Sequence, residues 1–303
     1  MILCRSHLFV PGGRADLLEK AGRFPADVLC LDLEESVLPE EKARARELAH
    51  AAVGWMSNAG LTVHVRVNSI ESGVTRDDLA GVLQRGLTGV VLAKTQSPQD
   101  VRDIDVLLRE QELAHEIRPG TIQLIVAIES ARALLRCEEI SRASTRLAAL
   151  MLGGEDFTFD MGVPRTRDGR ELDHARAVIA TCARAAGLIA LDTPFADIQD
   201  IDGLVADAER ARAAGFGGKY LIHPTHIEPV NRVFSPSEAD IAQARKVLGA
   251  WDAAQAQGLG AVQLDGRMVD RPVAERARLV MEQAEAIAKA EAQGRSLELP
   301  YSA

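Results

Sequence analysis

Eight short runs of apolar and β-branched residues recur between residues 6 and 224, with helical spacing between them. The runs are residues 6–10, 28–34, 61–68, 89–94, 122–129, 147–154, 188–194 and 218–224. Intervening stretches such as 39–56 and 173–187 place apolar residues at i, i+3 and i+4, the spacing of one helix face. Strands that alternate with amphipathic helices form βαβ units and a parallel sheet. Eight units predict an α/β fold, the (β/α)₈ TIM barrel, with a doubly wound open sheet as the alternative.

The chain continues well past the eighth run, further than a barrel needs. Residues 237–257 and 273–293 again have helical spacing, and a charged, glycine-containing loop is expected over 259–272. We therefore predict a TIM barrel catalytic domain over 1–235 and a C-terminal helical extension over 236–303. A second long loop is expected around 157–172, and long loops in compact domains are often functional.

The composition is that of a soluble globular protein. The chain has 303 residues, of which 47% are hydrophobic and 26% charged. A net charge of -9 without a long Lys/Arg run disfavours nucleic acid or an anionic membrane as partner. No stretch reaches the roughly 18 apolar residues of a membrane span, and no signal sequence is recognisable, so we expect a cytoplasmic protein. The four cysteines are far apart and are expected to be buried, reduced thiols.

Polar residues stand where nearly every predicted strand ends. They are Asp32, Glu34, Glu35, Arg66, Asn68, Lys94, Glu129, Glu155, Asp156, Asp192 and His223. In a TIM barrel the carboxyl ends of the strands build the active site, so we expect these side chains to meet at one mouth. Lys219 begins its strand and is expected to be structural. His64 lies deeper and is expected in the core, whereas for His223 a structural and a functional role stay open.

The alternation of side chains along two of the strands sharpens this expectation. In VHVRVN, His64, Arg66 and Asn68 share one face, and in LCLDLE, Asp32 and Glu34 do so. We expect both faces to point into the barrel.

Several acids converging in one mouth require positive charge. An unpaired buried carboxylate costs several kcal/mol, so Glu34, Glu129 and Asp156 need cations, and Arg66 supplies one. Two carboxylates about 4 Å apart repel by about 4 kcal/mol at an effective dielectric near 20, and a divalent ion between them reverses that sign. Oxygen ligands with few histidines nearby favour Mg²⁺.

Each of these residues has a simpler alternative role. Glu129 and Asp156 could form structural ion pairs with Arg66 or Lys94 instead of binding a metal. Arg66 could neutralise the acids instead of clamping a substrate carboxylate with its planar fork. Lys94 at a strand end also suggests a Schiff base, but the surrounding acids should keep it protonated.

Several segments together match a known family. They are RSHLFVPGGRAD (5–16), LDLEESVLPEEKARAR (31–46), VRVN (65–68), AIES (127–130), GGEDFTFDMG (153–162), ALDTPFADIQD (190–200), GFGGKYLIHPTHIEPVN (215–231) and DGRMVDRP (265–272). Through them the chain resembles the citrate lyase beta-chain and malyl-CoA lyase family of the HpcH/HpaI aldolase superfamily. The resemblance implies a TIM barrel, usually a trimer or a multiple of trimers, that uses Mg²⁺ to cleave or form a C–C bond in a 3-hydroxyacyl thioester.

The resemblance also implies roles for individual residues. Glu129 and Asp156 correspond to the Mg²⁺ ligands, and Arg66 to the residue that binds the substrate carboxylate. Glu34 and Glu35 correspond to residues that support this pocket.

Two further residues take roles from the resemblance. Asp270 corresponds to a general acid/base offered by a neighbouring subunit, although an aspartate before a helix also suits a turn. Arg14 corresponds to the segment that meets the thioester carrier, CoA or an acyl-carrier protein. The family more often has Asp at the position of Glu35, Asn at Gly13 and Pro at Ala93, departures that bear on substrate choice more than on metal binding.

The resemblance therefore implies a Mg²⁺-dependent Claisen-type lyase. It would act on malyl-CoA, citramalyl-CoA or citryl-CoA and release a 2-oxo acid and an acetyl-type thioester, as a homotrimer or hexamer. The alternatives are a citrate lyase beta chain acting on an acyl-carrier-protein thioester, a malyl-CoA thioesterase, a class II aldolase acting on pyruvate and free aldehydes, and a non-catalytic barrel subunit.

Overall fold

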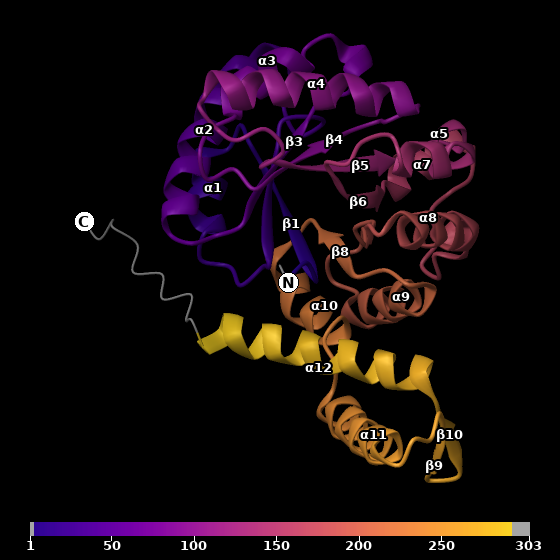
Figure 1. Ribbon diagram of the computed structural model, residues 1–303. Helices are drawn as coiled ribbons and strands as arrows, with labels where there is room; N and C mark the ends of the chain where they lie inside the picture. The colour runs from indigo at the N-terminus through magenta and orange to yellow at the C-terminus, as the bar shows by residue number, and fades with distance from the viewer. Residues whose placement is uncertain (1–2, 293–303) are drawn as a thin grey trace. The chain divides into compact units, whose positions relative to one another are not determined.

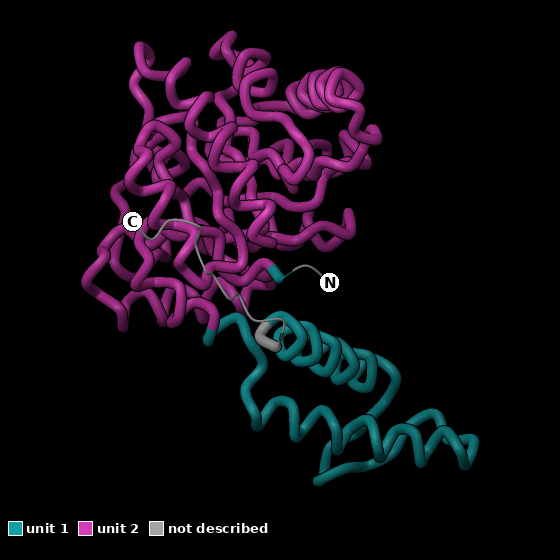
Figure 2. Tube along the Cα trace, turned by 90° about the vertical axis from the view of Figure 1, so that its left-hand side faces the viewer, with its two compact units in different colours: residues 1–3, 232–296 teal, residues 4–231, 297–303 magenta. Residues whose placement is uncertain are grey.

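The computed structural model describes residues 3–292 of the protein, with side chains up to residue 290. The described chain divides into two compact units, one formed by residues 4–231 and the other by residues 232–292 with Leu3 (Figure 2). The domains predicted over 1–235 and 236–303 stay a prediction. Residues 1–2 and 293–303 of those domains lie outside the described part.

The larger unit is a closed barrel of eight parallel strands, which confirms the predicted TIM barrel (Figure 1). Each strand pairs with the next in the sequence, and β1 closes the barrel against β8. The strands are β1 (Ser6–Pro11), β2 (Val28–Asp32), β3 (Val63–Val67), β4 (Gly89–Leu92), β5 (Gln123–Ile128), β6 (Leu147–Leu152), β7 (Ile189–Asp192) and β8 (Gly218–Leu221). Most end before the predicted runs do, so several of the candidate residues lie in the loops beyond the strands.

Helices cover the outside of these strands. They are α1 (Ala15–Ala21), α2 (Lys42–Asn58), α3 (Thr75–Val82), α4 (Pro98–Ala114), α5 (Ala131–Leu135), α6 (Cys137–Ser141), α7 (Gly154–Asp160), α8 (Asp173–Ala186), α9 (Ile201–Ala214) and α10 (Ile227–Val233). The start of α4 follows from its sequence, because Ser97 forms a capping box with Asp100 and proline occupies the first turn. Its buried residues include Val101, Ile104 and Leu108, which share one face.

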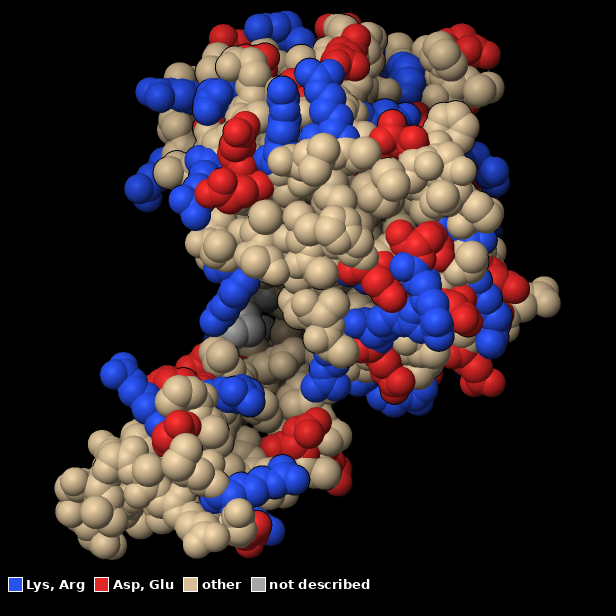
Figure 3. Space-filling view, turned by 90° about the vertical axis from the view of Figure 1, so that its right-hand side faces the viewer, with Lys and Arg blue, Asp and Glu red and all other residues tan. Residues whose placement is uncertain are grey.

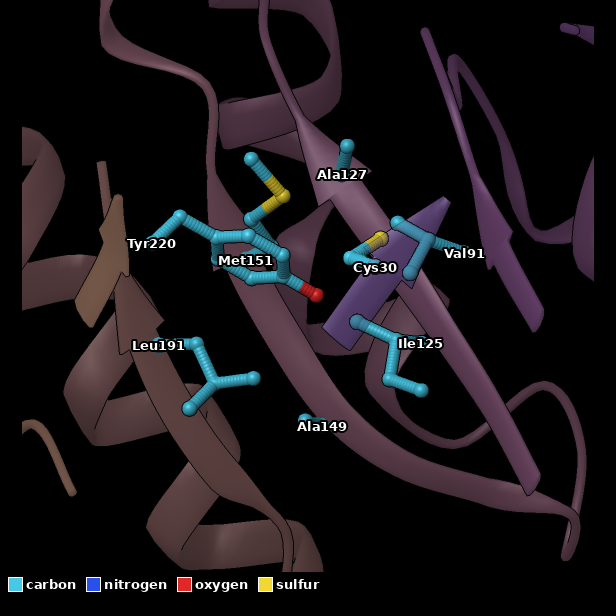
Figure 4. Close-up of a cluster of buried hydrophobic side chains, with 8 residues drawn as sticks. All are labelled: Cys30, Val91, Ile125, Ala127, Ala149, Met151, Leu191 and Tyr220. Carbon is cyan, nitrogen blue, oxygen red and sulfur yellow. The ribbon is translucent and has the colours of Figure 1, made fainter. Parts of the chain in front are cut away.

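The interior of the barrel is a packed apolar core rather than a channel (Figure 4). Six strands contribute to a cluster formed by Cys30, Val91, Ile125, Ala127, Ala149, Met151, Leu191 and Tyr220. All five residues of β2 are buried, as expected for a parallel strand covered on both faces. The four cysteines are free thiols, two of them buried.

The second unit contains α11 (Glu238–Ala256) and α12 (Arg271–Ala292). These helices match the two predicted C-terminal helical stretches. Their shared core includes Val247, Trp251 and Ala274.

The predicted loop over 259–272 is wrong in part, because it contains an antiparallel hairpin of β9 (Val262–Leu264) and β10 (Arg267–Val269). Asp265 and Gly266 both have positive φ, as a two-residue turn of the Asp-Gly type requires. The predicted loop 157–172 also contains regular structure, since it begins inside α7 and ends with the 3₁₀ helix Arg170–Leu172.

Among the helices described, none is long and apolar enough to cross a membrane. Charged side chains of both signs are intermingled on the face that Figure 3 shows.

Candidate functional site

Arg66, on β3, is held by acids at the end of β2. Its Nε and Nη2 donate to the two oxygens of Asp32 at 2.6 and 2.9 Å, and its Nη1 lies 3.2 Å from Glu34. The guanidinium also lies 4.5 Å from the ring centre of Phe9, a cation–π contact. Burial opposes the charge, but Asp32 and Glu34 outweigh it and raise the pKa of Arg66. Arg66 is thus a fixed cation whose fork is largely occupied by Asp32.

Lys94, just beyond β4, gathers two further acids. Its ammonium lies 2.8 Å from Glu34 and 2.7 Å from Glu35, and its backbone has a φ of +50°. Burial opposes the charge, yet the hydrogen bonds to these two acids raise the pKa of Lys94. The lysine is therefore protonated, as expected from the sequence, and a Schiff-base role is disfavoured.

Glu129 follows β5 directly and is buried, with only 4% of its surface exposed. Its Oε2 accepts a hydrogen bond of 2.8 Å from the backbone N–H of Lys94. Burial, with the nearby charges of Asp156 and Glu34, raises the pKa of Glu129 to about 7, while Arg66 acts in the opposite direction. This carboxylate is held in place but incompletely neutralised.

The glycine pair between β6 and α7 makes room for Glu129. A Cβ atom at Gly153 would lie 2.2 Å from Cγ and 2.3 Å from Oε1 of Glu129, so no other residue fits there. A Cβ at Gly154 would lie 2.7 Å from Nη1 of Arg165. The turn that carries Asp156 is therefore packed tightly between Glu129 and Arg165.

Asp156, in the first turn of α7, is the second acid without an ion pair. Burial and the charge of Glu35 raise its pKa, while Lys94 and Arg66 oppose the shift. Within residues 3–292, no cationic side chain lies within ion-pairing distance of Glu129 or Asp156. The charge of Asp156 also acts on Glu129. Two neighbouring acids with raised pKa values favour the binding of a proton or a metal cation.

The donor set fits a hard divalent ion. In the described part of the chain, no group of three or more His, Cys, Asp or Glu side chains is arranged to hold a metal. A pair of carboxylates nevertheless suits Mg²⁺, which commonly takes one or two and completes its shell with water and substrate oxygens. Glu129 and Asp156 are the residues that could hold it.

Two residues expected at the mouth point elsewhere. Asn68 donates to Asp78 of α3 at 2.6 Å and accepts from Lys42 of α2 at 2.9 Å, so its predicted inward orientation is wrong. It lies just beyond β3, where the alternation of the strand no longer applies.

Asp192 binds Arg176 of α8 and Lys219, outside the barrel interior. Its neighbour Leu191 belongs to the interior core, so the alternation of β7 would have placed Asp192 outward. Lys219 is fully buried in this network, in keeping with the structural role expected for it.

The histidines and Arg14 have local partners. His64 is buried, and burial lowers its pKa to about 3, as a core histidine requires. His223 accepts from the backbone N–H of Thr225 and so caps the turn after β8. Arg14 follows β1, is exposed, and donates to Asp16 at 2.9 Å.

Asp270 lies in the C-terminal unit, at the start of α12. It accepts a hydrogen bond of 3.3 Å from the backbone N–H of Val273, the geometry of a residue that begins a helix. Its role in acid/base chemistry stays a prediction.

From the sequence, Asp32 is expected at the mouth but not as the partner of Arg66, and Phe9 and Gly153 are assigned no role. Asp32 lies directly opposite Arg66 in the register of β2 and β3, so the pairing of the two strands is the signal that identifies it. Gly153 lies near the end of the predicted run 147–154, and a glycine there can mark the close approach of another part of the chain, here the side chain of Glu129 after β5.

The fold is a TIM barrel, and the acids gathered at its mouth make that mouth the candidate active site. The chain matches the HpcH/HpaI aldolase/citrate lyase family over residues 5–224 and belongs to it, which confirms the resemblance drawn from the sequence.

Known relatives span nearly the whole chain. It is 39% identical to the citrate lyase subunit beta of Escherichia coli K12, over 93% of each chain. It is 34% identical to the L-malyl-CoA/beta-methylmalyl-CoA lyase of Cereibacter sphaeroides, over 93% of this chain and 95% of that one. CitE of Mycobacterium tuberculosis, solved with magnesium, acetoacetate and coenzyme A, is 30% identical with a TM-score of 0.74, over 93% of this chain and 98% of that one. These relatives are carbon–carbon lyases, and the chain is an enzyme of that type.

Proposed function

We propose that the protein is a Mg²⁺-dependent lyase that cleaves a 3-hydroxyacyl thioester such as malyl-CoA, citramalyl-CoA or citryl-CoA. The products are a 2-oxo acid and an acetyl-type thioester. The observation that carries this proposal is the unneutralised pair of Glu129 and Asp156 at the mouth, the first of them buried with a pKa of about 7. The names of the E. coli and C. sphaeroides relatives, and the magnesium and coenzyme A of the M. tuberculosis structure, support it.

Glu129 and Asp156 hold the cation in this proposal. Bound there, Mg²⁺ supplies Lewis-acid stabilisation of negative charge on the substrate's carboxylate and 3-oxygen. Arg66 binds and orients the same carboxylate with the N–H groups that Asp32 does not use. Glu34 and Glu35 keep Arg66 and Lys94 in place.

The reaction is a retro-Claisen cleavage. Removal of the 3-hydroxyl proton by a base lets the C–C bond break, so that the oxygen becomes the carbonyl of the 2-oxo acid and the bonding electrons pass to the thioester as an enolate. Asp270 of the partner subunit then gives a proton to the enolate carbon, and in condensation it removes that proton. Arg14 contacts the thioester carrier. A homotrimer or hexamer would bring Asp270 to the mouth of its neighbour.

The test is to incubate the purified protein and Mg²⁺ with malyl-, citramalyl- and citryl-CoA while following 2-oxo acid and free thiol separately. A lyase forms 2-oxo acid without free thiol, and excess EDTA abolishes the product. Free thiol as the main product would identify a thioesterase instead, and no turnover of any of the three would contradict the proposal.

A second candidate, a chain that acts on an acyl-carrier-protein thioester, is favoured by the 39% identity to a citrate lyase subunit beta. Comparing citryl-CoA with citryl thioester on a phosphopantetheine-bearing carrier protein separates the two. At least tenfold higher kcat/KM with the carrier thioester would favour this candidate.

A further inference from the structure

Lys94 has an unusual backbone conformation for its residue type. Its φ of +50° lies in the left-handed region, which residues with a Cβ atom rarely adopt and which glycine adopts without strain. Such conformations persist where surrounding contacts hold them, often at functional sites. Both the backbone and the side chain of Lys94 make contacts at the mouth, and these contacts hold the residue in this conformation.

The backbone of Lys94 fixes Glu129. Its N–H donates to Glu129 Oε2 at 2.8 Å, and the other oxygen, Oε1, lies against Gly153. The carboxylate is thus held on two sides by main chain that follows β4 and β6, the two strands that flank β5. This contact depends on the direction of the N–H and not on the lysine side chain.

The side chain of Lys94 binds two acids other than Glu129 and Asp156. Its Nζ lies 2.8 Å from Oε1 of Glu34 and 2.7 Å from Oε1 of Glu35. Glu34 is buried and Glu35 is exposed, so the ammonium bridges the inner and outer parts of the loop after β2.

Each of these two acids also lies near one member of the pair. The charge of Glu34 acts on Glu129, and the charge of Glu35 acts on Asp156. A cation between Glu129 and Asp156 would therefore attract Glu34 and Glu35 as additional ligands if nothing else held them.

We propose that Lys94 is a positioning residue that limits the cation site to two carboxylates: its N–H orients Glu129, and its ammonium withholds Glu34 and Glu35. The proposal rests on the cation site of the proposed function. Mg²⁺ takes few carboxylates and keeps water and substrate oxygens, whereas Ca²⁺ takes six to eight oxygens and gains from added carboxylates. Lys94 therefore sets the preference of the site for Mg²⁺ over Ca²⁺.

The experiment measures Mg²⁺ and Ca²⁺ binding by isothermal titration calorimetry at one pH, on the full chain and its variants. Lys94→Gly removes the ammonium and relieves the backbone, and Lys94→Met removes the charge but keeps the stem. Lys94→Arg keeps the charge. Arg76→Met removes a cation from the exposed Arg76–Glu110 pair and is the matched control.

We expect the ratio of the Ca²⁺ to the Mg²⁺ dissociation constant to fall at least tenfold in Lys94→Gly and Lys94→Met. Lys94→Arg and Arg76→Met should stay within threefold of the wild type. Mg²⁺ should still bind to both charge-removing variants, because the backbone N–H to Glu129 remains. Melting temperatures identify any variant that fails to fold. If Lys94→Gly does not fold, Lys94→Met alone tests the removal of the charge.

An unchanged ratio in the folded charge-removing variants would overturn the role of Lys94. A wild-type protein that binds no Mg²⁺ would overturn both the cation site and this role. A wild type that binds Mg²⁺ with the expected selectivity but cleaves no thioester would contradict the proposed function and leave the role of Lys94 supported.

Discussion

A cluster of charged side chains at the barrel mouth and another between the barrel and its outer helices differ in whether their charges balance. In the outer cluster, Arg176 and Lys219 each contact both Asp192 and Asp207, at 2.5 to 3.0 Å. Two cations and two anions, all almost completely buried, balance one another's charge. This outer cluster has no free charge for a ligand.

The mouth is built differently. Arg66 forms an ion pair with Asp32, and Lys94 forms ion pairs with Glu34 and Glu35. Glu129 and Asp156 are left without a cationic partner among the described residues. Both clusters contain buried charged side chains, so burial alone does not distinguish a structural network from a candidate site. The two clusters are distinguished by the acids at the mouth that have no cationic partner in the described part of the chain.

The largest expected effect is on activity, from Glu129→Gln. The amide keeps the shape and the hydrogen bond from Lys94 but removes a negative charge from the proposed cation site. We expect the Mg²⁺-dependent lyase rate to fall by ~10³-fold or more, because a metal-binding site supplies several kcal/mol of transition-state stabilisation. Steady-state kinetics and Mg²⁺ calorimetry measure it.

The same substitution should not destabilise the metal-free protein at pH 8, because it removes an uncompensated buried charge. Wild-type turnover by Glu129→Gln would show that the mouth does not hold a catalytic metal. A folded variant that has lost Mg²⁺ binding is the expected result.

The opposite pattern is expected from Asp192→Asn in the outer cluster. Without this acid, Arg176 and Lys219 keep a buried positive charge, which typically costs about 3–5 kcal/mol. Urea denaturation should show that loss of unfolding free energy, while the Mg²⁺ affinity stays within twofold of the wild type. If Mg²⁺ affinity fell in proportion to stability, the two clusters would not be independent.

A smaller effect is expected on the pH dependence of stability, and it comes from Glu129 at the mouth. Glu129 has a folded-state pKa of about 7 against an ordinary 4.5, so the folded state binds its proton more tightly. The stability that this proton provides is complete below pH 4.5 and is lost as the pH rises through 7, by up to about 3 kcal/mol. Melting curves of the metal-free protein from pH 4.5 to 8 should show the decline, and Glu129→Gln should show less of it.

Added Mg²⁺ should oppose this decline, since it binds the deprotonated pair. The increase in melting temperature that Mg²⁺ causes should therefore grow from pH 5 to pH 8. An increase that is equal at all pH values would mean that the cation binds elsewhere.

The barrel and most of its mouth were predictable because both depend on local patterns. Strand period and helix spacing identified all eight strands, and the carboxyl-end rule brought Glu129, Asp156 and Arg66 to one mouth. The prediction for Asp192 is wrong because it rests on the residue's position at a strand end, whereas the inward orientation of its neighbour Leu191 turns Asp192 outward.

What the sequence could not supply were contacts set by register and by distant segments. The pairing of Arg66 with Asp32 depends on how β2 and β3 align, which neither strand specifies alone. The fit of Glu129 against Gly153 depends likewise on β5 and β6. The proposed roles of Arg14 and Asp270 come from the family resemblance alone.

The smallest expected effect, from Arg14→Ala, tests a third kind of charge pair. Arg14 and Asp16 are both at least half exposed, and exposed pairs are worth about 0–1 kcal/mol, so the melting temperature should hardly change. If Arg14 contacts the thioester carrier, KM for the CoA thioester should rise several-fold while kcat stays the same, because the contact lies away from the reacting atoms and is equal in ground and transition states. Asp16→Ala is the matched control, since it breaks the same pair but leaves the arginine free to bind, and its KM should not rise. Equal KM values for Arg14→Ala and the wild type would remove Arg14 from the carrier site, and a fall in kcat would place Arg14 near the reacting atoms instead.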